Sequence, residues 1–257
     1  MGVALGLALS TGSVGVQGQT PEADLAAFVQ KLDRLYYSPK TEGLRSLTCR
    51  VDWPLLTDLV RQMGGAAVTP TFAFSWKAPN REEFTVEGLP AGMQRISSQI
   101  LAMLKDRGGM IVPRPPSEFL ADFDLALQPS PQGKVVLAGR AKGPEAGAES
   151  VRMTYTTEGV LQEMAMSQAG QTMTATLTPT RHDGKLLPGT MVARAPQMQV
   201  ETAFTYGKQD GFWLIQSATI TYRDSAGKPL ETGQANPTTM RFVEYEINAD
   251  PPASGAP

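Results

Sequence analysis

The chain has 257 residues, of which 41% are hydrophobic and 19% are charged, and its formal net charge is -2. This composition can fill a sizeable core and offers no basic surface for a polyanion, so nucleic acid is not an expected partner. The 25 glycines and 20 prolines favour many strands joined by turns over a helical bundle. Length alone allows one large β domain or two small ones.

The first 19 residues contain no Lys, Arg, Asp or Glu, and they include an apolar run from Val3 to Leu9. This run resembles the hydrophobic region of a signal peptide, with Val16 and Gly18 at the small-residue positions of a cleavage site. The basic segment that usually precedes such a region is missing, and a disordered apolar tail is the alternative.

We therefore expect a signal-peptide-like segment at 1–19, a folded domain at 20–248 and a flexible tail at 249–257. No later segment has the roughly 18 to 20 apolar residues that are needed to cross a bilayer. The expected location is the periplasm or the secreted fraction, with the protein soluble after signal removal.

Helical periodicity appears between Leu25 and Tyr36, after a Thr20-Pro21-Glu22 start that suits a helix N-terminus. Ser38-Pro39 ends this helix, and alternation then predicts a strand at 44–51. A second short amphipathic helix is expected from Trp53-Pro54 to the Gly64-Gly65 pair.

A hairpin is predicted next, with strands at 72–76 and 83–87 and the aromatic residues on one face. The spacing of apolar residues predicts a third helix over 92–107, with Gly108-Gly109 as its C-terminal cap. The proline-rich segment 112–116 is expected to be a rigid connector.

From Phe119 onward, apolar and polar residues alternate with a period of two, which predicts strands with one wet face. The clearest solvent-facing stripe is the series Thr172, Thr174, Thr176 and Thr178. About nine one-sided strands make a mainly β (α+β) fold with a curved antiparallel sheet and a single buried face. Three short helices can shield only part of that face, so the sheet should close on itself or leave an apolar hollow beneath the helices.

The hollow is the functional prediction, because flexible thioethers suit surfaces that accommodate variable apolar shapes. An ordinary methionine-containing β core is the alternative. The candidate lining residues are Phe72, Phe74, Trp76, Phe84, Val86, Met153, Tyr155, Met164, Met166, Met173, Leu177, Phe204, Leu214 and Ile220. The candidate lid residues are Leu55, Leu59, Ile96, Ile100 and Leu104.

Residues suited to catalysis are scarce. Cys49 is the only cysteine, so an intrachain disulfide is impossible, and its alternating neighbours predict a small core residue. His182 is the only histidine and is expected in a loop, and neither GxSxG nor HExxH is present. The acidic pair Glu244 and Glu246 is expected on a solvated strand face. We predict no catalytic residue and no cofactor, and no residues cluster with metal-ligand spacing, although a site built only of carboxylates stays open.

The segment Trp76-Lys77-Ala78-Pro79-Asn80 resembles the early hairpin of the LolA-like periplasmic lipoprotein carriers, in which a similar Lys-Arg-Pro-Asn turn follows a helix. The stretch 155–177 is similar to the central strand pair of that family, and 211–214 and 242–248 resemble the closing strands of broader LolA-like lipoprotein-sorting proteins. The resemblance covers most of residues 22–248.

This resemblance implies an unclosed β-barrel with a helical lid over a hydrophobic cavity that receives acyl chains. The family arginine that helps to control lid closure and cargo release corresponds to Ala78 here, which puts carrier-style release in doubt.

The expected function is therefore non-catalytic binding of lipid or of an acylated lipoprotein in the cell envelope, as in lipoprotein transport, sorting and outer-membrane biogenesis. The expected partners include a membrane-associated donor or acceptor protein, and the protein is expected to be a monomer. The alternative is a binding or regulatory module that recognises a protein partner through its open sheet edge.

Overall fold

The structure is a computed structural model that describes residues 21–65, 67–90, 92–105, 107–130, 133–230 and 236–249. The expected signal-peptide-like segment at 1–19 lies outside these ranges, as does the expected tail apart from Ala249.

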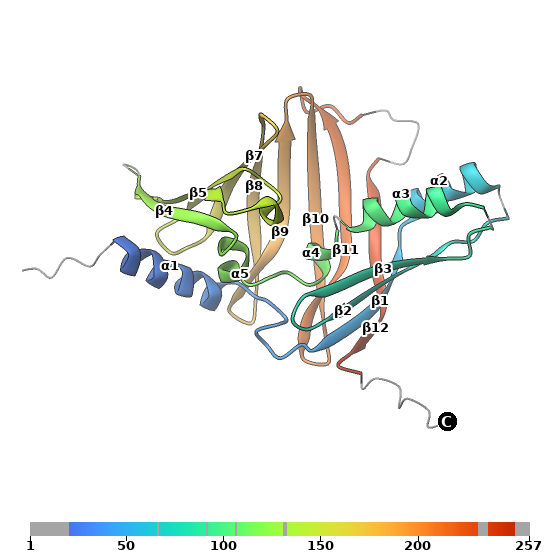
Figure 1. The fold of residues 1–257 in the computed structure, drawn as a ribbon, viewed down its shortest axis with the longest axis horizontal. Coiled ribbons are helices and arrows are strands. Elements are labelled where there is room, and N and C mark those ends of the chain that lie inside the picture. Colours follow the sequence, from blue (N-terminus) through green and yellow to red (C-terminus); the bar gives the residue numbers. More distant parts are fainter. Residues whose placement is uncertain are drawn as a thin grey trace, which may run out of the picture.

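Twelve antiparallel strands form one continuous sheet in the order β3-β2-β1-β12-β11-β10-β9-β8-β7-β6-β5-β4 (Figure 1). The edge strands β3 and β4 stand at opposite ends of this order, so the sheet is not closed. This confirms the predicted mainly β fold with an unclosed antiparallel sheet and a helical lid. The strands are β1 Ser46–Asp52, β2 Thr71–Lys77, β3 Arg81–Glu87, β4 Phe123–Pro129, β5 Val135–Ala141, β6 Ser150–Tyr155, β7 Leu161–Gln168, β8 Gln171–His182, β9 Lys185–Ala195, β10 Met198–Gln209, β11 Phe212–Asp224 and β12 Thr238–Ile247.

Consecutive strands lie side by side from β4 to β12 and from β1 to β3, and the helix α2 (Pro54–Gly64) lies between β1 and β2. The pairing of β1 with β12, in which Leu47 lies opposite Ile247, joins the two parts of the chain into one sheet. The β12–β1 pair therefore depends on residues about two hundred positions apart, a non-local contact that helical or turn propensity does not specify.

The helices lie against one face of the sheet, which we call the inner face (Figure 1). The α-helices are α1 Pro21–Leu35, α2 Pro54–Gly64, α3 Gln94–Lys105, α4 Gly108–Ile111 and α5 Pro116–Leu120, and a 3-10 helix spans Pro144–Ala146. The first three match the predicted helices, because each has an apolar stripe at helical spacing.

Two separate hydrophobic cores form between these helices and the inner face. In core 1, Leu56 and Val60 of α2 and Ile100 and Leu104 of α3 pack with Phe74 of β2 and other residues of β1, β2, β11 and β12. In core 2, Leu32 of α1 and Leu120 of α5 pack with residues of β4 to β6. Each half of the sheet thus has its own helical cover, where the sequence suggested a single hollow under one lid.

The count of about nine strands was too low, because β5 and β9 were not predicted. Both strands bury consecutive residues at one end: Val136 and Leu137 in β5, and Leu186 and Leu187 in β9. Burial on both faces removes the alternation by which strands are recognised.

The helix count was also too low, because α4 and α5 are only 4 and 5 residues long. Gly108-Gly109 begins α4 instead of capping α3, which ends at Lys105. The predicted connector 112–116 is correct up to Pro115, where α5 takes over.

Two connections join the covers of the two cores. The strap, residues Val112 to Pro115, runs from α4 to α5 across the inner face (Figure 1), and the Ser38 hydroxyl donates a hydrogen bond of 2.8 Å to the Pro113 carbonyl. In addition, Asn80 in the β2–β3 turn donates a hydrogen bond of 3.2 Å to the Glu118 carboxylate of α5.

Candidate functional site

Strand register aligns apolar residues in rows across the inner face. One row passes from Leu137 through Met153, Met164 and Ala175 to Ala193, and each of these residues lies opposite the next. Because directly opposed residues in an antiparallel pair share a face, the row places β5 to β9 in one apolar surface. The row starts inside core 2 and leaves it toward the middle of the sheet.

A patch of inner-face residues in the middle of the sheet belongs to neither core. We call it the central strip, and it consists of Met173, Leu177, Met191, Met198 and Val200 on β8, β9 and β10. Leu177 lies opposite Met191, and Met173 lies opposite Met166 of β7. Met173 is 46% exposed and Met198 is 38% exposed, while the other three residues are half-buried.

Asp224 of β11 lies opposite Met198 at the end of the strip, but the strip itself has no charged member, because alternation sends Arg194 of β9 and Glu201 of β10 to the other face. There Arg223 pairs with Glu201 at 3.3 Å, and Arg194 donates a hydrogen bond of 3.1 Å to Thr176. Thr172, Thr176 and Thr178 are exposed and Thr174 is half-buried, as the predicted threonine stripe requires. The strip is therefore an uncharged surface on a sheet whose outer face is polar.

Polar side chains border the strip: Thr202 lies opposite Met191, Asp224 lies opposite Met198, and Gln162 lies on the neighbouring strand β7. Gln162 is the bulged residue of β7, where the register shifts so that Leu161 lies opposite Tyr155 and Glu163 lies opposite Thr154. Its Oε1 atom is buried without a hydrogen-bond partner, a property shared only with Arg107 Nε among the buried side-chain atoms of the described residues. Gln162 lies two residues before Met164 on the same face, where its Oε1 atom is an unpaired, buried hydrogen-bond acceptor.

The sequence-predicted lining residues divide among the two cores, the central strip and one further buried position. Core 1 contains or contacts Phe72, Phe74, Trp76, Phe84, Val86, Phe204 and Leu214, together with all five predicted lid residues, Leu55, Leu59, Ile96, Ile100 and Leu104. Core 2 contains or contacts Met153, Tyr155, Met164 and Met166. Met173 and Leu177 lie in the central strip, and Ile220 is fully buried outside both cores.

Residues of the strip that were not predicted as lining are Met191, Met198 and Val200. Met191 lies in β9, where Pro188 and Gly189 interrupt the sequence pattern, so no strand was expected there. Val200 did alternate visibly in the sequence with Thr202 and Phe204, and this signal could have included it.

Cys49 and His182 do not form a reactive pair in this fold. Burial raises the pKa of the Cys49 thiol to about 12, and its side chain is 3% exposed in core 1, which agrees with the predicted core role. His182 is the last residue of β8, just before the turn in which it was expected, and its ring lies 4.4 Å from that of Trp213. Cys49 is therefore protonated at neutral pH and shielded from reagents.

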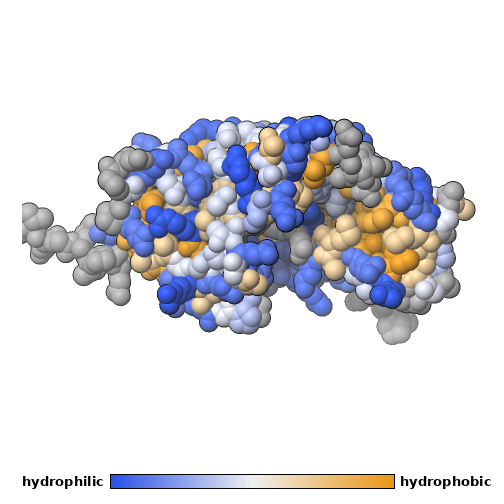
Figure 2. Space-filling view, turned by 90° about the horizontal axis from the view of Figure 1, so that it is seen from above, coloured by the Kyte–Doolittle hydropathy of each residue, from blue (hydrophilic) through white to orange (hydrophobic). Residues whose placement is uncertain are grey.

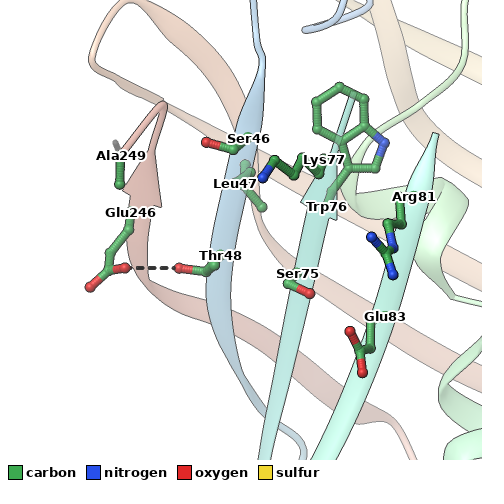
Figure 3. Close-up of a pocket in the computed structure, with 10 residues that line it drawn as sticks. All are labelled: Ser46, Leu47, Thr48, Ser75, Trp76, Lys77, Arg81, Glu83, Glu246 and Ala249. Carbon is green, nitrogen blue, oxygen red and sulfur yellow. Dashed lines mark hydrogen bonds between the residues drawn. The ribbon is translucent and has the colours of Figure 1, made fainter. Parts of the chain in front are cut away.

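A shallow depression on the outer face lies across β12, β1, β2 and β3 (Figure 3). Its polar members are the outward residues of these strands, and Thr48 donates a hydrogen bond of 3.2 Å to Glu246 there. Figure 3 shows the side chains of Thr48, Ser75 and Glu83 side by side on neighbouring strands. The surface has both Lys77 and Arg81 beside its acids, so it has no dominant charge with which to select a ligand.

Neither a metal centre nor a membrane-spanning helix emerges from the described residues. No group of three or more His, Cys, Asp or Glu side chains in these ranges could hold a metal ion. Within the same ranges, no helix combines the length and the apolar character needed to span a bilayer.

Comparison with known proteins gives one structural neighbour. A crystal structure of a LolA superfamily protein from Nitrosomonas europaea is similar, with a TM-score of 0.37 and 10% sequence identity over 88% of this chain and 94% of that chain. No protein-family model and no curated protein matches the chain.

Proposed function

We propose that the protein binds an acyl chain of a lipid or of an acylated lipoprotein on the central strip, without catalysing a reaction. The observation that supports this proposal is an apolar strip of three methionines, a leucine and a valine that belongs to neither filled core, with Met173 and Met198 exposed and the other three half-buried. Soluble proteins seldom expose contiguous apolar surface without a partner for it.

The composition of the strip suits a variable chain. Methionine side chains are flexible and polarisable, so they adapt to acyl chains of different length and unsaturation. Burial of each methylene contributes about 0.8 kcal/mol, so eight methylenes against the strip supply on the order of 6 kcal/mol before association costs. The buried Oε1 of Gln162 is an unpaired acceptor, so it would take a hydrogen bond from a donor at the end of the chain, such as an amide N–H, a hydroxyl or a protonated carboxyl group.

The proposal places the protein in the cell envelope, where acylated proteins and free lipids need a soluble carrier. A membrane-associated donor or acceptor protein is the corresponding partner, and the carrier acts as a monomer. The export-like start of the sequence supports this location. Carrier-style release controlled by the family arginine is not part of the proposal, because the β2–β3 turn has the exposed Ala78 at that position.

The test compares two neighbouring positions on β8. Met173 and Thr172 are both exposed and adjacent in sequence, but they point to opposite faces of the sheet. Met173→Glu should weaken fatty-acid binding at least tenfold, measured by displacement of a fluorescent fatty acid, because the new carboxylate would have to be desolvated beside the acyl chain. Thr172→Glu should leave displacement unchanged.

Native mass spectrometry of protein purified from its own envelope supplies the second measurement. The expected result is a co-purifying lipid mass that disappears on delipidation. A clean apo mass together with no displacement by fatty acids would refute acyl-chain binding, and a tight protein partner without lipid uptake would instead support the protein-recognition alternative.

A further inference from the structure

We propose that the surface of α2 and α3 docks onto an anionic lipid membrane. The proposal goes beyond acyl-chain binding, because it concerns a different surface and a different event. It starts from the four large hydrophobic side chains that are exposed in the described residues, all of which are methionines. Met173 and Met198 belong to the central strip, whereas Met63 on α2 and Met103 on α3 do not.

Met63 is 45% exposed and Met103 is 43% exposed. Half-buried Leu55 and Leu59 of α2 and Ile96 of α3 lie on the same helices and pack against core 1 beneath. In Figure 2, which looks at the molecule from above, hydrophobic residues gather over the α2 and α3 side, with hydrophilic residues at the border. We call this surface the helical patch.

The charged residues of α2 and α3 indicate what kind of partner the helical patch binds. The helices carry Arg61, Arg95 and Lys105 against the single acid Asp58, which lies 3.7 Å from Arg61. Arg95 and Lys105 are exposed, and neither has an ion-pair partner among the residues that the structure describes.

The acids nearest in the fold do not cancel these charges. Strand β3 contacts α3, and its Glu83 and Glu87 alternate with Phe84 and Val86, which pack against core 1, so these two carboxylates belong to the outer face. Glu82 shares the inner face with Phe84, but its carboxylate lies beside Gly108 of α4 and interacts with Arg114. The whole chain has a net charge of -2, and an apolar patch with unpaired cations is a local exception to it. Apolar side chains bordered by Lys and Arg are the arrangement that binds the interface of anionic bilayers.

The geometry connects the helical patch with the central strip. Met173 follows the β7–β8 turn and Met198 follows the β9–β10 turn, and these turns form the upper end of the sheet in Figure 1. The helical patch is seen from the same side in Figure 2. Docking through the patch would therefore turn the exposed end of the strip toward the lipid surface.

The experiment is flotation of the full-length protein with vesicles of phosphatidylcholine alone or of phosphatidylcholine with one third phosphatidylglycerol. Wild type should float with the anionic vesicles and much less with the neutral ones, and added salt should release it. Arg95→Gln with Lys105→Gln should lower the partition coefficient on anionic vesicles about 25-fold, since each cation near such a surface contributes about a fivefold effect. Met63→Gln with Met103→Gln should lower it about tenfold on the same vesicles, because partly exposed thioethers lose the apolar gain.

Lys134→Gln with Arg140→Gln is the matched control, because it removes two exposed cations near β5, at the other end of the sheet. Equal loss in this control would overturn the proposal in favour of non-specific attraction, as would flotation that is the same on both vesicle types or absent on both. Fatty-acid displacement measured without vesicles should be unchanged in the helical-patch variants. A failure of membrane docking is thus distinguishable from a failure of acyl-chain binding.

Discussion

Replacing one leucine in each core tests whether the two cores are separate in energy as well as in space. Leu104 of α3 and Leu32 of α1 are both 0% exposed, and they belong to core 1 and core 2 respectively. Truncation of a fully buried leucine to alanine costs about 3 kcal/mol. If core 1 opens locally, Leu104→Ala should therefore raise the population of its open form about 150-fold.

Cys49 reports on this opening, because it is buried in core 1. With its pKa raised to about 12, only about one thiol in ten thousand is ionised at pH 8 in the closed state, so a thiol reagent labels it essentially through opening. The labelling rate should rise about 150-fold in Leu104→Ala and stay within about threefold of wild type in Leu32→Ala. Urea unfolding should confirm that both variants are destabilised. Equal acceleration of labelling in the two variants would refute the separation of the cores and show that the sheet opens as one unit.

Two further predictions concern stability. Burial raises the pKa of Cys49 to about 12. Burial, opposed by the hydrogen bond from the Trp213 N–H, also raises the pKa of Tyr37 to about 12. Because deprotonation of these groups then favours the unfolded chain, their contribution to stability should be complete below about pH 9 and should fall as the pH rises toward 12. Urea titrations across this range should show a shallower fall in Cys49→Ala, by up to about 4 kcal/mol at the alkaline end, and an unchanged slope would show that the thiol does not contribute. Gly88→Ala should destabilise the fold more than Gly43→Ala. Both glycines have positive φ, but a Cβ at Gly88 would lie 2.4 Å from the Thr69 carbonyl oxygen, whereas a Cβ at Gly43 would face open space. Equal urea midpoints for the two variants would contradict the clash.

The elements with strong local patterns could be predicted from the sequence. The helix that ends near Tyr36, the aromatic hairpin of β2 and β3, and the alternating strands β6 to β8 all appear where periodicity places them. Cys49 was predicted as a core residue because its neighbours alternate. In each case the pattern reflects one apolar face and one polar face, which is the property that single-sequence reasoning detects.

Features that depend on distant contacts could not be predicted. Strand β9 is buried on both faces at Leu186 and Leu187, and its edge at Leu186 forms a bridge to Tyr36, a partner 150 positions away. The division into two cores depends on the β1–β12 pairing and on which helix covers which strands. As a result, the residues predicted to line one hollow are apolar, as expected, but most of them fill the two separate cores.

The strap from Val112 to Pro115 has a consequence for how a ligand could arrive. Four residues span at most about 14 Å, and prolines at 113 and 115 keep the segment extended and stiff. The helices α4 and α5, which the strap joins, therefore cannot move apart unless one of them unpacks from the sheet. We expect an acyl chain to reach the central strip without any separation of the two helical covers at this segment.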